Sequence, residues 1–329
     1  MVGRRWEKES VVTDRTGVIG VMLPRDLPRD QVLPFARRAR EVGFKQLWVV
    51  EDLGFRGGIA QAAAVLAATG DIHVGIGLLP VGARNAAFAA MECATLAELF
   101  PGRISVGVGH GMPHWMRSAG AWPPSPLGLL EEYVRALRAL LRGERLDVEG
   151  RYVRLSGVAL ETPPAVVPDI LAGVRGPRSL AVSGRVADGT ILADPVTPEY
   201  VRAALGQVAA PRPHRLVAYN AVAVDADADR ALRAARPALA WVGEPDLAAH
   251  VEPLPFADGL AALRARCASR EEFAQRLPDD WVRRLTLAGT PAQVRARLDE
   301  LFAAGVTSAV LSPVGPDPAA ALDTLAALL

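Results

Sequence analysis

A glycine-rich turn, Gly173-Val-Arg-Gly-Pro-Arg-Ser179, is the feature whose spacing points most directly to chemistry. It lies between an apolar segment, 168–173, and an amphipathic stretch that begins SLAVSGRVA. Glycines let backbone amides approach an anion closely, and the N-terminus of a helix adds partial positive charge. The turn therefore predicts a phosphate cradle for a cofactor tail, with an ordinary strand-to-helix turn as the alternative. The candidate binding residues are Gly173, Val174, Arg175, Gly176, Pro177, Arg178 and Ser179.

Two further glycine-rich segments follow apolar runs of the chain. One is GIGLLPVGARN at 75–85, where two glycines near a strand end predict a bulge beneath a ligand, or else a plain turn. Arg84 and Asn85, which end this segment, could reach a cofactor or only complete the turn. The other is GVGHG at 107–111, which resembles part of a nucleotide-binding loop but lacks the full spacing.

Three titratable residues stand where apolar segments end. Glu51 and Asp52 follow the run QLWVV, and His110 follows RISVGVG. A carboxylate or an imidazole at the end of a barrel strand can exchange a proton or orient a substrate. Adjacent side chains on an extended chain point to different sides, so a paired-carboxylate mechanism is not expected. The alternatives are a salt bridge or helix cap for the carboxylates and a packing role for the histidine. No zinc-like ligand spacing occurs, and no metal site is predicted.

Eight short apolar segments carry these features, and each is followed by a helical pattern. The segments are near-continuous apolar runs, which are typical of parallel strands buried on both faces. Helices are expected at 30–42, 87–99 and 128–142, because apolar residues there recur on one helical stripe. The expected strands span 17–23, 46–50, 72–79, 103–109, 168–173, 189–193, 216–224 and 306–312.

Helix boundaries can also be read from single residues. Asp30, Thr197 and Thr290 are plausible N-caps, because a short oxygen-bearing side chain can accept a hydrogen bond from the first helical turn. The segment that Thr290 opens, TPAQVRARLDELFAAG, is expected to stop at Gly305.

Alternating strands and helices at this spacing predict right-handed βαβ units, and eight of them close most simply into a (β/α)8 TIM barrel. An open doubly wound sheet is the alternative, but the chain reads PRDLPRD where that fold needs a glycine-rich turn. Residues 1–16 are expected to form an N-terminal arm and 17–329 a single domain. Two insertions, 110–127 and 236–285, interrupt the alternation at the C-terminal mouth and should roof the substrate pocket.

Composition limits the classes of partner. Half of the 329 residues are hydrophobic, and the formal net charge is +1, so neither nucleic acid nor an anionic membrane is expected to bind. Cys93 and Cys267 are the only cysteines, which argues against a disulfide framework. The polar beginning, MVGRRWEKES, contains no apolar signal-peptide core, and a cytoplasmic location is expected.

Taken in order, four blocks of the sequence resemble the bacterial luciferase-like superfamily. This superfamily includes flavin-dependent monooxygenases and coenzyme F420-dependent reductases. Together the blocks reach over nearly the whole chain after residue 17. They are 74–111, with its Arg-Asn turn and glycine-rich strand end, 129–155, 169–192, with GVRGPRSL and GRVADG, and 288–315.

The resemblance implies an isoalloxazine or deazaflavin ring at the barrel mouth, against a bulge after the third strand. In this sequence the bulge maps to Gly77 and Leu78, where relatives have a non-proline cis peptide, and the same bond is predicted here. Such a bond costs about 2.5–4 kcal/mol, so placing the ring would be its purpose. The phosphate tail is expected to meet the amides of Val174, Gly176 and Arg178. The expected cofactor-binding set is completed by Arg84, Asn85 and Gly109.

The sequence departs from one branch of this superfamily. Reductases that resemble the sugar-phosphate dehydrogenases carry a histidine after the second strand, where Asp52 stands here. The glutamate that they place after the fourth strand aligns near Met112. A sugar phosphate is therefore not the expected substrate. The candidate proton donors are His110, Glu51 and Asp52.

The resemblance favours an F420-dependent oxidoreductase, which transfers a hydride between the deazaflavin and a small organic or peptide-like substrate with a C=C, C=N or C=O bond. One alternative is an FMN-dependent two-component monooxygenase, to which a separate reductase would supply reduced flavin. A second alternative is a non-catalytic binding protein on the same scaffold. The expected partners are a small-molecule or peptide substrate and, for an oligomer, a second copy in a homodimer.

Overall fold

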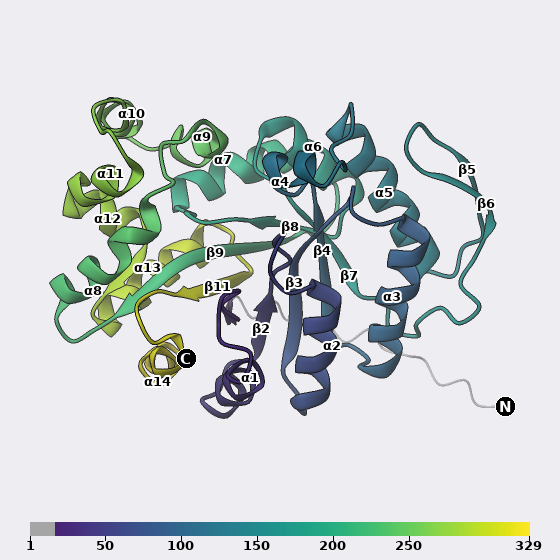
Figure 1. Cartoon of the computed structure of the whole chain (residues 1–329), viewed down its shortest axis with the longest axis horizontal. Coiled ribbons are helices and arrows are strands. Elements are labelled where there is room, and N and C mark those ends of the chain that lie inside the picture. The colour runs from purple at the N-terminus through teal and green to yellow at the C-terminus, as the bar shows by residue number, and fades with distance from the viewer. Residues whose placement is uncertain (1–16) are drawn as a thin grey trace, which may run out of the picture.

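The computed structural model describes residues 17–329, and the expected N-terminal arm, 1–16, lies outside the described residues. Its central strands are β1 (Val18–Met22), β2 (Gln46–Val49), β3 (His73–Pro80), β4 (Ile104–Gly109), β7 (Asp169–Gly173), β8 (Gly189–Leu192), β9 (Arg215–Val224) and β11 (Ser308–Pro313). They run parallel in the order β9-β11-β1-β2-β3-β4-β7-β8, and β8 pairs back onto β9 (Figure 1). The predicted TIM barrel and its eight strands are confirmed.

Helices surround this closed sheet (Figure 1). They are α1 (Val32–Glu41), α2 (Gly58–Ala68), α3 (Ala86–Leu99), α5 (Pro126–Leu141), α6 (Pro177–Val186), α7 (Pro198–Val208), α8 (Ala228–Ala235), α13 (Pro291–Ala304), α14 (Pro318–Leu325) and the 3-10 turn η3 (Ala326–Leu328). Their N-caps agree with the sequence at Thr197, which accepts from the Tyr200 N–H, and at Thr290, which accepts from the Gln293 N–H. Gly305 ends α13 with a φ of 119°, a conformation that favours glycine.

The predicted cap at Asp30 is wrong. The helix begins one residue later than the prediction requires, with Gln31 as N-cap and without a side-chain hydrogen bond. A turn precedes it, in which the Gln31 N–H donates to the Pro28 carbonyl at 2.9 Å. Because Gln31 is already in a helical conformation, with φ −95° and ψ −12°, the turn leads directly into α1 without a capping side chain.

Replacing Thr290 by alanine should destabilise the barrel measurably. The Thr290 hydroxyl and the Gln293 side chain form a reciprocal capping box at the start of α13. Thr290→Ala removes one half of it and should lower the free energy of unfolding by about 1 kcal/mol in urea titrations. The matched control is Thr324→Ala on the exposed side of α14, which should cost nothing. Equal effects of the two substitutions would contradict a capping role.

The two predicted insertions adopt helical structure. The first contains α4 (Pro113–Ser118). The second builds a separate apolar cluster around Leu260, Phe273 and Val282, apart from the barrel core. Its elements are η1 (Arg236–Leu239), η2 (Pro245–Leu247), α9 (Ala248–Val251), α10 (Ala257–Ala265), α11 (Arg270–Arg276) and α12 (Asp279–Leu285), which Figure 1 shows beside the barrel in green.

Three strands were not expected from the sequence. β5 (Leu146–Glu149) and β6 (Arg154–Val158) form an antiparallel hairpin beside α5 (Figure 1). The Glu132 carboxylate of α5 accepts N–H groups of Arg151, Tyr152 and Val153 and holds the tip of this hairpin. β10 (Leu287–Gly289) extends the sheet beyond β9.

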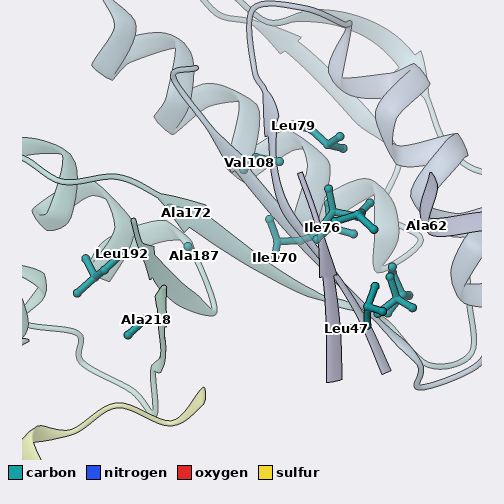
Figure 2. Packing of buried hydrophobic residues seen from close by; sticks show 14 of the residues in the cluster. Leu47, Ala62, Ile76, Leu79, Val108, Ile170, Ala172, Ala187, Leu192 and Ala218 are labelled. Atoms are coloured by element: carbon teal, nitrogen blue, oxygen red, sulfur yellow. The ribbon is translucent and has the colours of Figure 1, made fainter. Parts of the chain in front are cut away.

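The core has two layers. Between sheet and helices, residues such as Leu47, Ile76 and Ile170 are fully buried (Figure 2). Inside the barrel, a second cluster consists of Trp48, Leu171, Ile191, Val217, Tyr219 and Val310. Among the described residues, no helix combines the length and the apolar character that crossing a membrane requires.

Candidate active site

A cavity of about 1120 Å³ opens at the carboxyl ends of the barrel strands. This is the face where barrel enzymes hold their substrates, and the volume exceeds the usual 300–1,000 Å³ of a single-ligand pocket. The predicted site residues that line it are Glu51, Asp52, Gly77, Leu78, His110, Gly173, Val174, Arg175, Gly176 and Ser179. Arg84, Asn85, Gly109, Pro177 and Arg178 lie outside this lining.

The predicted bulge is present at the end of β3. The pairing of β3 with β4 shifts register between Ile76 and Leu79, so that Gly77 and Leu78 stand out of the ladder. The predicted cis peptide is wrong: within residues 17–329 the cis bond is Asp194–Pro195. The register shift absorbs the extra length with a trans peptide, which avoids the cost of a non-proline cis bond.

Glycines in neighbouring strands make room for this bulge. A methyl group at Gly107 would lie 2.5 Å from the Gly77 carbonyl oxygen, and one at Gly173 would lie 2.8 Å from a methyl carbon of Leu78. Gly109 also approaches this side chain, since a methyl group there would lie 3.1 Å from a methyl carbon of Leu78. The position of the bulge therefore depends on three glycines that it approaches closely, two in β4 and one in β7.

The glycine-rich turn presents free backbone donors. Gly176 is the N-cap of α6, with φ −87°, and a side chain there would meet nothing within 4 Å, so neither strain nor packing requires glycine. In the described part of the chain, the N–H groups of Gly176 and Arg178 have no hydrogen-bond acceptor. The Val174 amide, which was expected to join them, donates to the Ile191 carbonyl at 3.3 Å. That prediction is wrong because Val174 continues the pairing of β7 with β8.

The two carboxylates after β2 already have partners. The Glu51 carboxylate forms an ion pair with Arg84, with 3.0 Å between Oε1 and Nη1, and accepts the Gly58 N–H at 2.8 Å. Asp52 forms an ion pair with Arg25 at 2.5 Å. The structural role expected for these carboxylates from the sequence was a salt bridge or a helix cap. Glu51 has both roles, and Asp52 has the first. Asn85 likewise caps α3, by accepting the Ala87 N–H at 2.8 Å.

His110 connects the end of β4 to the glycine-rich turn. Its Nε2 lies 3.0 Å from the Ser179 hydroxyl, and its Nδ1 is buried without a partner among the described residues. Burial, followed by the positive charge of Arg175, lowers the pKa of His110 to about 4. The imidazole is therefore neutral at pH 7. It can exchange hydrogen bonds in the cavity but does not hold a spare proton there.

Arg175 joins the two insertions above the cavity. Its guanidinium donates to the Asp246 carbonyl oxygen at 2.9 Å and lies 3.6 Å from the Met112 sulfur. The first insertion also contributes Trp115 and Trp122 to the cavity wall. Residues of both predicted insertions therefore line the cavity, and Arg175 of the glycine-rich turn contacts both of them.

Two cavity residues were missed by the sequence analysis. Asp194 follows β8, and its carboxylate is exposed to the cavity. Tyr219 lies within β9, and its side chain is 6% exposed. The position of Asp194 directly after a predicted strand was an available signal, although an Asp-Pro pair also indicates a turn. Tyr219 gave no local signal.

His250 should make stability depend on pH. The ring is fully buried, Nδ1 lies 3.1 Å from the Pro195 carbonyl, and burial lowers its pKa to about 4. An unfolded histidine titrates near pH 6.5, so this stabilisation is complete above pH 6.5 and is lost as pH falls toward 4. Between pH 7 and pH 4.5, the free energy of unfolding measured in urea should therefore fall less in His250→Gln than in wild type, by up to about 3 kcal/mol. His114→Gln, at an exposed ring, is the control. An unchanged acid slope in His250→Gln would contradict this account.

Comparison with known proteins identifies the class. A closed β/α barrel with a cavity at its strand ends is the architecture of an enzyme, and residues 16–308 match the model of the luciferase-like monooxygenase family. The chain belongs to this family and is an enzyme. In the part of the chain that the structure describes, no group of three or more His, Cys, Asp or Glu side chains could hold a metal ion.

Individual relatives are named as reductases and monooxygenases. The chain is 29% identical to the 5,10-methylenetetrahydromethanopterin reductase of Methanolobus tindarius over 88% of this chain and 94% of that one. Its fold is similar to the F420-dependent tetrahydromethanopterin reductase from Methanopyrus kandleri, with a TM-score of 0.80, 22% identity, and 94% and 97% of the two chains covered. An FMN complex of the oxygenating constituent of 3,6-diketocamphane monooxygenase from Pseudomonas putida has a TM-score of 0.69, with 17% identity and 95% and 96% coverage.

Proposed function

We propose that this enzyme is an F420-dependent oxidoreductase that transfers a hydride between the deazaflavin and a small organic or peptide-like substrate. The observation that carries the proposal is that one cavity contains both the bulge at Gly77–Leu78 and the open turn at Gly176. A planar ring with an anionic tail needs both features. The two reductases named above, one similar in sequence and one in fold, support the choice of F420.

The residues present fit such a cofactor. The free N–H groups of Gly176 and Arg178, at the positive end of α6, would hold the anionic tail. The bulge would support the ring, and the open space above Gly176 is space that a side chain would fill. When bound, a deazaflavin supplies a carbon that accepts or donates a hydride.

The chain itself positions the reactants and excludes water. Trp115 and Trp122 of the first insertion cover the cavity, and the Arg175 contact to Asp246 attaches the second insertion to the glycine-rich turn. Fixed geometry and a dry site are the contributions that a protein makes to hydride transfer. His110, Glu51 and Asp52 remain candidates for proton exchange in this proposal, although each already has a partner.

An FMN-dependent monooxygenase is the second candidate. It is favoured by the similar fold of the FMN complex from Pseudomonas putida. The same turn would hold the single phosphate of FMN, so the turn does not separate the two cofactors. In this case a partner reductase would supply reduced flavin.

Titration of the purified chain with F420 and with FMN decides between them. Fluorescence quenching of each cofactor gives its dissociation constant under the same conditions. The proposal requires F420 to bind at least about tenfold more tightly than FMN, a difference of about 1.4 kcal/mol. Tighter binding of FMN would favour the monooxygenase over the F420-dependent oxidoreductase. If neither cofactor bound, both candidate functions would be overturned.

A further inference from the structure

We propose that Asp194 and Tyr219 form an anchor for the substrate on the cavity floor, and that this anchor selects substrates with a hydrogen-bond-donating group, such as an amine, an iminium or a hydroxyl, at the reacting end. The inference rests on the proposed function for the position of the reaction. It concerns two residues to which no role has been assigned above.

The first observation is the isolation of the Tyr219 hydroxyl. Tyr219 is 6% exposed, lines the cavity, and has an oxygen without a hydrogen-bond partner in the described structure. Its ring packs edge-on against Trp48 inside the barrel, with 5.9 Å between centroids, so the side chain has little freedom to turn away. A buried hydroxyl without a hydrogen-bond partner destabilises the folded protein, and a bound ligand that paired with it would remove that cost.

The second observation places this hydroxyl beside the bulge. A methyl group built on Gly77 would lie 3.0 Å from the Tyr219 oxygen. The hydroxyl therefore adjoins the residue over which the cofactor ring is proposed to lie. A substrate atom that reached Tyr219 would be in the part of the cavity where the reaction takes place.

The third observation is that Asp194 is held in place but left unpaired. Within residues 17–329 its carboxylate has no ion pair and no hydrogen bond to another residue, unlike Glu51 and Asp52. Burial raises the pKa of Asp194, against the opposing charges of Arg175 and Arg25. The carboxylate is open to the cavity, and a donor group on a bound ligand would pair with it there.

The loop that carries Asp194 is fixed from two sides. The Val196 N–H donates to the Asn220 side-chain oxygen at 2.9 Å, and the Pro195 carbonyl lies 3.1 Å from His250 Nδ1. Asn220 is 1% exposed and His250 is fully buried. Both are positioning residues, because they hold the loop without reaching the cavity. A charged side chain kept rigid and unpaired is the arrangement of a preorganised binding group.

The two side chains are close enough to act together. They come from β9 and from the end of β8, strands that pair directly, with Leu192 opposite Ala218. Burial, and then the negative charge of Asp194, raise the pKa of Tyr219 well above its ordinary value. Tyr219 therefore keeps its proton, and its hydroxyl can donate or accept a hydrogen bond, whereas the Asp194 carboxylate accepts one. A group with two donors, such as an amidinium, or with one donor and one acceptor, such as a hydroxyl, satisfies both residues.

Benzamidine, a planar cation, provides the test in the full chain. Its binding is measured by isothermal titration for wild type and for Asp194→Asn, Tyr219→Phe and Asp299→Asn. We expect at least a fivefold weaker affinity for Asp194→Asn and a smaller loss for Tyr219→Phe. Asp299→Asn, which makes the same charge change on the exposed side of α13, should bind as wild type does. Equal affinity of Asp194→Asn and wild type overturns the anchor.

Thermal unfolding of the ligand-free variants keeps the test independent of folding defects. Because neither group has a partner within the part of the chain that the structure describes, Asp194→Asn and Tyr219→Phe should unfold at the same temperature as wild type or higher. A fall of several degrees in either variant would show a structural partner and would overturn the proposal. The F420 titration of wild type judges the proposed function separately, since benzamidine binding requires no cofactor.

Discussion

Gly176→Asp should abolish tight cofactor binding while leaving the fold as stable as before. Aspartate is a better N-cap than glycine and favours the positive end of α6, so the free energy of unfolding should stay equal or rise by a few tenths of a kcal/mol. The same carboxylate would face the anionic tail. Two like charges about 4 Å apart near a protein surface repel by about 4 kcal/mol. We expect the F420 dissociation constant to increase at least about 100-fold in fluorescence titrations.

Two controls separate charge from shape in this experiment. Gly176→Asn introduces a side chain of nearly the same size as aspartate but without its charge. It should therefore lose only the part of the F420 affinity that depends on open space at this position. Gly206→Asp adds the same charge at an exposed glycine of α7, where nothing lies within 4 Å, and should bind F420 normally. If Gly176→Asp binds F420 within threefold of wild type, the tail does not lie at this turn.

Gly107→Ala should damage both the bulge and the fold. The added methyl group would lie 2.5 Å from the Gly77 carbonyl oxygen and 2.6 Å from that of Ile76, and backbone atoms in a paired sheet cannot rotate away. Overpacking of a core typically costs about 1–3 kcal/mol. The variant should lose that much stability in urea, and its F420 affinity should fall at least about tenfold because the ring support moves.

The control for this substitution is Gly206→Ala. This glycine lies in the exposed part of α7 with open space around it, so alanine should stabilise the helix by about 0.5–1 kcal/mol. If Gly107→Ala has the stability and the F420 affinity of wild type, the bulge can adjust to the added methyl group. Gly107 is then not required for the shape of the site.

The strands, the bulge after β3 and the glycine-rich turn could be predicted because their signals are local. A parallel strand buried on both faces is a continuous apolar run, and glycines near a strand end, as at 75–77 and 173–176, indicate a bulge or a close approach of the backbone. The hairpin β5–β6 was missed because it is short and half-exposed, with only Leu155 buried along its strands. Its position depends on the carboxylate of Glu132, which lies on a different element.

The chemistry of the cavity was less predictable, because it depends on contacts between distant parts of the chain. His110 and Glu51 were identified from their positions at strand ends, but their partners Ser179 and Arg84 come from other elements. The presence or absence of a partner decides whether a polar group is available to a ligand. That the Tyr219 hydroxyl has no partner among residues 17–329 can be seen only once closure of the barrel places this side chain beside Gly77.

The second insertion has a consequence for how this scaffold diversifies. Its apolar cluster around Phe273 is separate from the barrel core, and Asp246 and Ala238 are its residues on the cavity wall. The cluster also contacts the barrel, because it includes Leu232 of α8 and because His250 lies 3.1 Å from the Pro195 carbonyl oxygen. Mutations that keep these contacts and change the two cavity-wall positions would therefore alter the range of substrates without disturbing the barrel.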